Sequence, residues 1–285
     1  MKIAAYSATL IQHSIHEAMS IVKRIGFDGI EIAAVEPHLS GKTSAARLRE
    51  MRSMADGHGL DIPAIGGYMG DFSTASDKEC EQAFSDFQRI LDASDVLGAG
   101  MIRVFPGGPN AFLAQDYHYA KSAFWLHKCA AAASEHGKRI VFEIHNGYLS
   151  ETVDTSLQLV NSIGAENAGL IHDAGNMYIV DTDCGRDSVI RLGSKLFHVH
   201  VKDVRRVEEA GPRGTFINFT KHGDEKFKHC LLGEGEVRFQ PLFDALREAG
   251  YSGWVTLEPF ANVPAPERLA HDLRKVRQML GLAVG

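Results

Sequence analysis

The chain contains the segments VFEIH (141–145), GLIHD (169–173), HVHVKD (198–203) and WVTLE (254–258), and these four stretches decide its fold. Each combines apolar, β-prone residues with a metal-binding side chain near its carboxyl end. In a barrel of parallel strands the carboxyl ends meet at one mouth, where such barrels place their chemistry. We therefore expect four ligand-type residues to converge there: Glu143, Asp173, His200 and Glu258.

Outward from these segments, strand-like and helix-like stretches alternate along the whole chain. The expected strands are 2–7, 28–33, 60–66, 100–105, 139–145, 168–173, 195–202 and 253–258. The expected helices lie near 14–25, 41–58, 76–97, 115–136, 152–163, 185–192, 239–249 and 265–280. This alternation implies parallel strands with right-handed crossovers, so we predict an α/β fold, a (β/α)₈ TIM barrel forming a single domain over residues 1–285. A doubly wound sheet is the alternative, but the turn at 6–10 (YSATL) has no GxGxxG pattern.

The connection after the seventh strand is unusually long. Residues 203–236 separate this strand from the next helix, whereas such loops usually take about two to six residues. The stretch contains a β-like segment, TFINF, at 215–219 and a charged run at 221–229. Because the insertion leaves the carboxyl end of a strand, we expect it on the catalytic face. A lid, a subunit contact and a solvated excursion all remain open.

Composition excludes several classes of function. The formal net charge of −6 and the lack of a long basic run argue against binding to nucleic acid. No apolar run reaches about 18 residues, so we expect no transmembrane helix. The chain has 4 cysteines without CxxC spacing, and its amino terminus has no signal-like apolar region. A reduced, cytoplasmic protein is the expectation.

The four converging residues predict a metal site. Two glutamates, one aspartate and one neutral histidine form an oxygen-rich set that suits Mn²⁺, Mg²⁺ or Co²⁺ better than a structural zinc ion. Taken singly, Glu143 is open to a structural salt bridge and Asp173 to a helix cap. Because ligand-type residues recur at the ends of strands five to eight, one shared site is favoured. We expect a single divalent ion, Mn²⁺ first, with Mg²⁺, Co²⁺ and Zn²⁺ as alternatives.

Several further residues are candidates for substrate binding. His145 shares the face of the glutamate two positions before it, which favours substrate contact or proton shuttling. Lys202 lies two positions after His200, on the same face of the strand, and points either into the site or to solvent. Glu31 and Arg103 are charged residues in apolar strands, so both are candidates to line the site, or to satisfy each other. His198 is expected to pack in the inner layer.

Together these motifs resemble the xylose-isomerase-like barrel superfamily, the sugar phosphate isomerase/epimerase group. The matching motifs cover nearly the whole chain, and the ordered set is specific to the superfamily but not to one reaction. They include GFDGIE at 26–31, the strands that end in Glu143 and Asp173, HVHVKD at 198–203, LGEGEV at 232–237 and GYSG at 250–253.

Similarity to the ketose 3-epimerases within this superfamily implies roles for individual residues. Glu143, Asp173, His200 and Glu258 would hold one Mn²⁺-like ion, and the two glutamates would act as acid and base on opposite faces of the substrate. Arg206 would contact substrate, and a dimer or tetramer would be expected. The chain departs from many relatives at Asn176, where they carry a substrate-binding histidine; asparagine can donate a hydrogen bond but cannot ionise.

The resemblance implies a metal-dependent isomerase or epimerase that acts on a small keto-sugar or polyol through an enediolate. The alternative is a lyase or dehydratase with the same enediolate chemistry, either inosose dehydratase-like, as HVKDVR at 200–205 indicates, or acting on 3-keto-glycosides. A non-catalytic barrel that binds carbohydrate or a partner is the hypothesis from a different class. The trizinc DNA-repair branch is excluded, because it requires histidines where this chain has AIG at 64–66 and RVF at 103–105.

Overall fold

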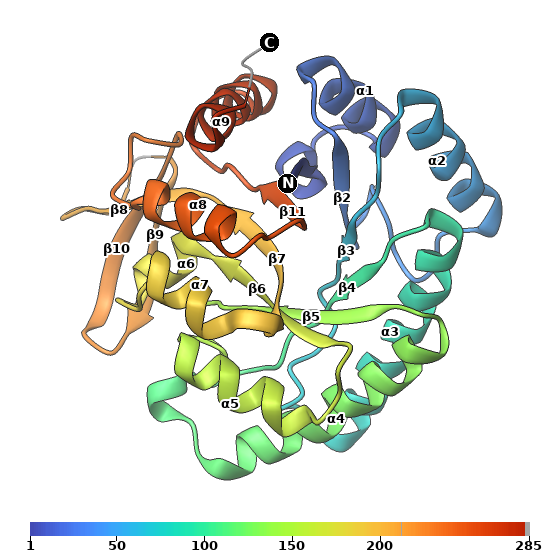
Figure 1. Cartoon of the computed structure of the whole chain (residues 1–285). Coiled ribbons are helices and arrows are strands. Elements are labelled where there is room, and N and C mark those ends of the chain that lie inside the picture. Colours follow the sequence, from blue (N-terminus) through green and yellow to red (C-terminus); the bar gives the residue numbers. More distant parts are fainter. Residues whose placement is uncertain (212, 283–285) are drawn as a thin grey trace.

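The centre of the molecule is a closed barrel of eight parallel strands, seen in a computed structural model that describes residues 1–211 and 213–282. Around the barrel the strands follow the order β1-β11-β7-β6-β5-β4-β3-β2, so the first strand of the chain pairs with the last. Helices surround the strands on the outside (Figure 1). The predicted TIM barrel is confirmed, and the doubly wound alternative is wrong.

All eight expected strands are present, and several are shorter than expected. They are β1 (Lys2–Tyr6), β2 (Gly29–Ala33), β3 (Ala64–Gly66), β4 (Met101–Arg103), β5 (Arg139–Glu143), β6 (Ala168–Asp173), β7 (Leu196–Val201) and β11 (Trp254–Leu257). The strand β5 ends at Glu143 itself, so His145 belongs to the loop that follows and not to the strand.

The eight expected helices also form, with one short addition. They are α1 (Ile15–Ile25), α2 (Ala45–His58), α3 (Asp77–Leu97), α4 (Asp116–Glu135), α5 (Val153–Ile163), α7 (Arg186–Leu192), α8 (Phe239–Glu248) and α9 (Ala265–Leu280). The added helix, α6 (Ala174–Ile179), begins directly after β6, and the side chain of Asp173 caps it by accepting from the backbone N–H of Asn176. Its 6 residues are too few for a periodic pattern to reveal.

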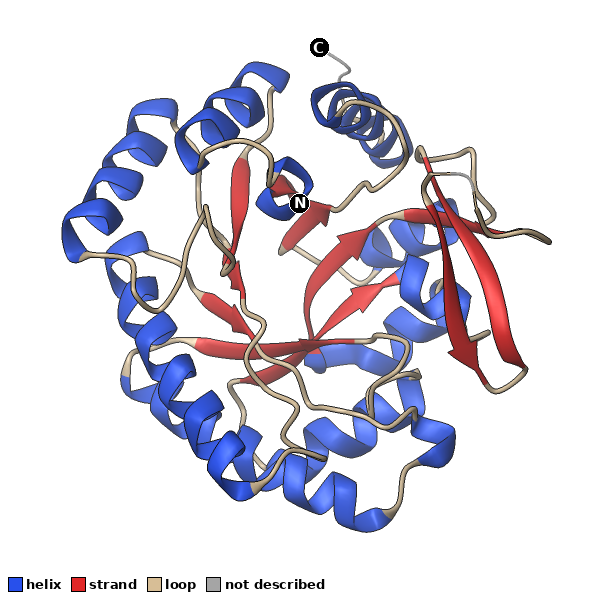
Figure 2. Cartoon of the chain, turned by 180° about the vertical axis from the view of Figure 1, so that it is seen from behind, coloured by secondary structure: helices blue, strands red, loops and turns tan. Residues whose placement is uncertain are grey.

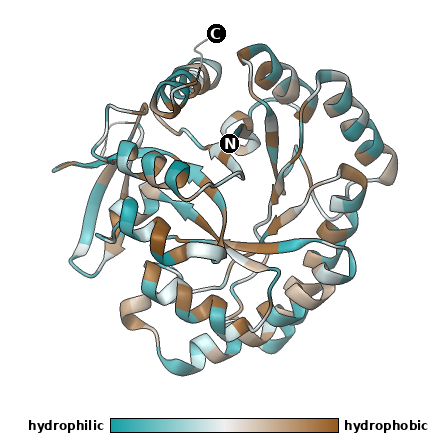
Figure 3. Cartoon of the chain, viewed as in Figure 1, coloured by the Kyte–Doolittle hydropathy of each residue, from teal (hydrophilic) through white to brown (hydrophobic). Residues whose placement is uncertain are grey.

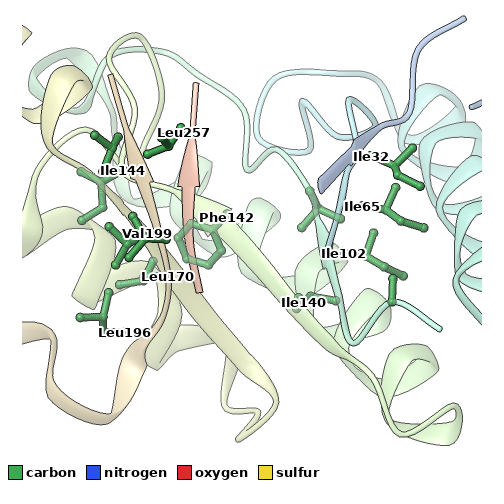
Figure 4. Packing of buried hydrophobic residues seen from close by; sticks show 14 of the residues in the cluster. Ile32, Ile65, Ile102, Ile140, Phe142, Ile144, Leu170, Leu196, Val199 and Leu257 are labelled. Atoms are coloured by element: carbon green, nitrogen blue, oxygen red, sulfur yellow. The ribbon is translucent and has the colours of Figure 1, made fainter. Parts of the chain in front are cut away.

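Two apolar layers hold the barrel together. Small and medium side chains from Ala64, Met101, Val141 and Ile171 fill its interior. The larger layer lies between the strands and the helices, where Phe142, Leu170 and Val199 pack together (Figure 4). Apolar stretches of the helices accordingly alternate with polar ones that face outward (Figure 3). Within the described residues, no helix has the length and apolar character needed to cross a membrane.

The insertion after β7 is an ordered three-stranded antiparallel sheet. Its strands β8 (Asp203–Arg206), β9 (Thr215–Thr220) and β10 (Gly223–Cys230) pair in the order β8-β10-β9. Figure 2 shows this sheet beside the rim of the barrel. The expected β-like stretch at 215–219 is part of β9, so the insertion has regular secondary structure where it is described.

Buried Asp203 anchors the base of this sheet. Its Oδ2 accepts hydrogen bonds from the backbone N–H groups of Gly233 at 2.8 Å and Gly235 at 3.0 Å, and its Oδ1 accepts from Val237 at 3.3 Å. A side chain at Gly235 would collide with the Asp203 carboxylate, which explains the glycine there. One carboxylate thus fixes both ends of the insertion.

Candidate metal centre and active site

Strand register brings the four predicted ligand residues to one level. Asp173 on β6 is the register partner of His200 on β7, and the backbone N–H of Glu258, just after β11, donates to Val201 at 2.9 Å. Glu143 ends β5, the neighbour of β6. One ligand atom from each of the four lies within 4.8 Å of the others, and all four residues are buried. The structure therefore brings together the full set that the strand-end pattern predicted.

The imidazole of His200 is oriented as a metal ligand would be. Its Nε2–H donates to Glu31 Oε2 at 3.1 Å, while its Nδ1 lies 3.6 Å from Glu143 Oε1 and has no hydrogen-bond partner among the described residues. A buried ring nitrogen without a partner, opposite one that is held by a carboxylate, fits a metal ion. Burial lowers the pKa of His200, but Glu31 and Glu143 outweigh it and hold that pKa well above its usual value. Metal binding at Nδ1 would displace a proton.

Glu31 accepts hydrogen bonds from two histidines beneath the site. Its Oε2 also accepts from His198 Nε2 at 2.9 Å, and this same nitrogen lies 3.0 Å from Thr256 Oγ1. Burial raises the pKa of Glu31, yet His200 and His198 hold it well below its usual value, so the carboxylate is ionised. The hypothesis that Glu31 and Arg103 satisfy each other is therefore wrong, because both partners of Glu31 are histidines on β7.

Arg103 instead holds Glu143. Its Nη1 donates to Glu143 Oε2 at 2.7 Å and its Nη2 to the hydroxyl of Tyr6 at 3.0 Å. The side-chain amide of Asn176 donates to the other oxygen of Glu143, Oε1, at 2.8 Å. Burial raises the pKa of Glu143, but Lys202, His200 and Arg103 hold it well below its usual value. Glu143 is thus a fixed, ionised carboxylate.

The ammonium group of Lys202 lies among the remaining carboxylates. Its Nζ donates to Asp173 Oδ2 at 2.8 Å and to Glu258 Oε2 at 2.9 Å. Burial raises the pKa of Asp173 to about 7, even though Lys202 lowers it. The pattern of negative oxygens that receives this cation also fits a hard divalent cation, which favours carboxylate ligands.

A cavity of about 310 Å³ opens above the ligand set. Of the residues expected to bind substrate, His145, Asn176, Lys202 and Arg103 line this cavity with Glu143 and Glu258. Glu31 does not line it, because it lies below, against the histidines. Arg206 does not reach it either: its guanidinium binds Glu225 at 3.0 Å and Asp181 at 2.7 Å on the insertion side. Nothing in its position supports a contact with substrate in this cavity.

Sequence analysis missed much of the rest of the cavity wall. These side chains come from loops, from the end of α6 or from the insertion, where no strand periodicity points to a site: Tyr68, Phe105, Asn146, Ile179, Phe216, Asn218, His229 and Phe260. The one available signal was the even-numbered parity of Phe216 and Asn218 within the β-like stretch 215–219, which places both side chains on one face. The insertion therefore forms part of the cavity wall.

Comparison with known sequences places this geometry in a family. The family described as xylose isomerase-like TIM barrel matches residues 19–279 of the chain. An inosose dehydratase of Clostridium perfringens is 22% identical over 260 residues, which covers 87% of this chain and 82% of that protein. An inosose dehydratase of Mesomycoplasma hyopneumoniae is 26% identical over 264 residues, covering 86% and 81%.

Solved structures share the fold over almost the entire chain. A D-allulose 3-epimerase from Methylomonas sp. superposes with a TM-score of 0.76 at 20% identity, covering 98% of each chain. The probable 3-DHS dehydratase AsbF of Bacillus anthracis gives 0.80 at 17% identity and covers 97% of this chain and 98% of its own. The IOLI protein, solved with a bound zinc atom, gives 0.80 at 18% identity, with 99% and 98% covered.

Proposed function

Because the chain belongs to the xylose isomerase-like TIM-barrel family, whose relatives described above include epimerases and dehydratases, we propose that it is a divalent-metal-dependent isomerase or epimerase. Its substrate is a small keto-sugar or a ketone derived from a polyol. The observation that carries the proposal is the buried ligand set Glu143, Asp173, His200 and Glu258 at the base of the cavity.

The same four residues would hold one divalent ion, with Mn²⁺ as the first candidate and Mg²⁺, Co²⁺ or Zn²⁺ as alternatives. The unpartnered Nδ1 of His200 and the three carboxylates supply one nitrogen and at least three oxygens. A bound ion would polarise the substrate carbonyl and so lower the free energy of the enediolate formed from it.

The two glutamates approach the substrate from different sides. In the barrel order, β5 and β11 lie three positions apart in a ring of eight, so Glu143 and Glu258 face the cavity from well-separated directions. One carboxylate removes the proton beside the carbonyl, and the enediolate accepts a proton in return. If the proton returns to the neighbouring carbon, the substrate is isomerised. If it returns to the same carbon from the opposite face, the substrate is epimerised.

The surrounding polar groups position the reacting atoms. Arg103 and Asn176 hold both oxygens of Glu143, so its carboxylate stays fixed beside the substrate. Lys202 presents a cation to the cavity, which stabilises negative charge as it develops on a substrate oxygen. His145, whose Nδ1 lies 2.6 Å from the carbonyl oxygen of Asn146, lines the cavity as a hydrogen-bonding or proton-shuttling group.

A dehydratase is the second candidate function. Lys202, buried beside two carboxylates, favours it, because a fixed cation stabilises an oxygen that departs from the enediolate. The inosose dehydratases among the relatives support the same chemistry. The proton taken from beside the carbonyl would then go to the hydroxyl group on the carbon next to the enediolate, whose C–O bond breaks as water leaves and a C=C bond forms.

Metal content and hydrogen exchange together test the proposal. Mass spectrometry of Mn²⁺-reconstituted wild type should find about one ion per chain, and Glu258→Ala should lose it while Glu151→Gln, a buried glutamate outside the ligand set, retains it. Incubation with keto-sugars and inososes in D₂O should place deuterium beside the carbonyl of the product. Loss of water instead would select the dehydratase, and a chain without a bound ion or exchange would favour a non-catalytic binding barrel.

A further inference from the structure

Helix α4 has apolar residues on its outer side as well as on its inner side. The inner side packs in the core through buried Trp125, Leu126 and Cys129. On the outer side, Tyr117 is 65% exposed and Phe124 is 60% exposed. A helix on the surface of a globular protein normally presents polar residues to solvent, and a helix that is apolar all round is normally covered. The outer side of α4 is therefore a surface that a partner would cover.

The exposed residues of α4 repeat with the spacing of a helix–helix contact. Five exposed residues follow one another at alternating intervals of three and four positions: Tyr117, Ala120, Phe124, His127 and Ala131. This alternation keeps their side chains in one stripe along the helix, which is the pattern that a helix presents to a partner helix. We call these five residues the α4 seam.

A hollow lies beside the seam, where α4 and α5 are neighbours on the outside of the barrel (Figure 1). Its volume is about 560 Å³, and its lining includes Ala120, Ala123 and Phe124 on α4 and Ser162 and Ile163 on α5. The alanines are too small to fill the space next to the phenylalanine ring. A large side chain from a partner helix would fill it, as a knob fills a hole between the side chains of a facing helix.

The seam is complementary in size to a second copy of itself. A two-fold axis perpendicular to the helix at the level of Ser122 pairs positions that lie equally far on either side of it. It sets Phe124 of one copy opposite Ala120 of the other, so a large ring meets a small side chain. It also sets Tyr117 opposite His127, so a phenol hydroxyl meets an imidazole that can hydrogen-bond with it. Parallel helices would instead set each residue against its own copy, phenylalanine against phenylalanine and alanine against alanine.

Charge favours the same antiparallel arrangement. Asp116 lies in the first turn of α4, whereas Lys128 lies in its second half, with Nζ 4.1 Å from the ring centroid of Trp125. Neither charged side chain has an ion-pair partner among the described residues. The two-fold axis brings Asp116 of each copy to the level of Lys128 of the other. Opposite charges therefore flank both ends of the seam, which favours this register over others.

We propose that the α4 seam is the contact surface of a homodimer, in which the α4 helices of two copies pack antiparallel about an axis at Ser122 and the two α5 helices lie beside them. The 20 residues of α4 and the 11 residues of α5 offer a face of about 500 Å² at an interhelical spacing of about 10 Å. Specific interfaces take about 800 Å² from each partner, so we expect a small interface with a dissociation constant on the order of micromolar. Among the described residues, none of α4 lines the catalytic cavity, so this inference does not rest on the proposed function.

Sedimentation velocity on the full chain tests the surface. Wild type should shift from monomer toward dimer between about 0.5 and 50 µM. Phe124→Glu and Tyr117→Glu each place a charge on the seam and should weaken association at least about tenfold, with an unchanged circular dichroism spectrum because both side chains are exposed. Ile190→Glu is the matched control, since this side chain is 62% exposed on α7, outside the seam, and the variant should associate like wild type. A wild type that stays monomeric at about 50 µM, or a dimer that persists in both seam variants, would overturn the proposal.

A distance between spin labels tests the antiparallel arrangement. Ala131 lies nine residues after Ser122, so its two copies would be about 27 Å apart along the paired helices. Ala131→Cys would carry a nitroxide label on a Cys184→Ser background, because the other three cysteines are buried. Double electron–electron resonance on the dimer should then give a distance of about 25–35 Å. A distance below about 20 Å would indicate parallel helices, and one above about 45 Å would indicate a contact elsewhere, so either result would overturn the proposal.

Discussion

At the scale of single residues, the site depends on how each nitrogen of His200 is used. The Nε2–H donates to Glu31, and this leaves Nδ1 directed at Glu143 and the other ligands. Carboxylates that hold a ligand histidine in this way orient its ring and raise its basicity. Glu31 is shared with His198, so one buried carboxylate sets the orientation of two imidazoles. It would act on a bound metal ion through His200, which makes it a positioning residue in the proposed site.

Replacement of this carboxylate should weaken metal binding. Glutamine in Glu31→Gln keeps an acceptor oxygen for the two imidazoles but carries no negative charge, so it no longer raises the basicity of His200 as the carboxylate does. We expect affinity for Mn²⁺ to fall about 10- to 100-fold, measured by calorimetric titration or by the electron paramagnetic resonance signal of free Mn²⁺. Asp272→Asn alters a buried carboxylate outside the ligand set, which accepts a hydrogen bond from the backbone N–H of Leu232, and should leave this affinity unchanged. Equal losses in the two variants would indicate general destabilisation.

How far these residues could be predicted depends on whether their signal is local. Glu143, Asp173, His200 and Glu258 each end an apolar strand, so a position along the chain was enough to identify them as a set. The partner of Glu31 was not predictable in this way, because His198 and His200 are more than 160 positions away and the pairing depends on which strands face each other inside the barrel. Arg103 was singled out as a charge in an apolar strand that could line the site or pair with Glu31; it does line the cavity, but it pairs with Glu143.

At the scale of elements, local signals predicted the repeating units and failed at the irregular ones. Ser14 and Ser76 form capping boxes with Glu17 and Glu79, and Gly26 ends α1 with a φ of 102°, so these helix boundaries follow from sequence. The helix α6 and the pairing of β8, β9 and β10 could not be predicted from the sequence. Antiparallel pairing within the insertion depends on contacts between strands separated by loops, and no alternation within one strand reveals its partner.

The anchor of the insertion gives a prediction at this scale. Asp203→Ala removes the carboxylate that accepts hydrogen bonds from the backbone N–H groups of Gly233 and Gly235. It also removes the weaker hydrogen bond from the backbone N–H of Val237. We expect a loss of about 2 kcal/mol in the free energy of unfolding by urea, together with faster hydrogen exchange at 233–237. Asp224→Ala, in the exposed part of the β9–β10 hairpin, should change stability by less than about 0.5 kcal/mol. Unchanged exchange at 233–237 would show that Asp203 does not hold the insertion.

At the scale of the whole molecule, the barrel and the insertion form one structure around the cavity. The strands β1 and β11 close the barrel through four register pairs, and the side chain of Arg277 on α9 donates to the carbonyl of Gly26 at 2.7 Å, which ties the last helix to the first. The insertion adds His229 to the cavity wall, where the ring stacks on Phe216 and lies next to Phe260. A change in the charge of that one imidazole therefore affects the contact between the insertion and the barrel.

This coupling predicts how stability responds to acid. Burial lowers the pKa of His229 to about 4, compared with 6.5 for an ordinary histidine. Between these values the unfolded chain binds a proton that the folded chain does not, so the contribution of His229 to stability is lost as the pH falls from 6.5 toward 4. His229→Phe keeps an aromatic ring in the wall but cannot titrate. Between pH 7 and pH 4.5, the free energy of unfolding in urea should therefore decrease for both proteins. The decrease should be smaller for His229→Phe, and the difference between the two decreases should be about 2 kcal/mol. An equal acid-induced loss in wild type and His229→Phe would show that His229 is not held neutral beside Phe216 and Phe260.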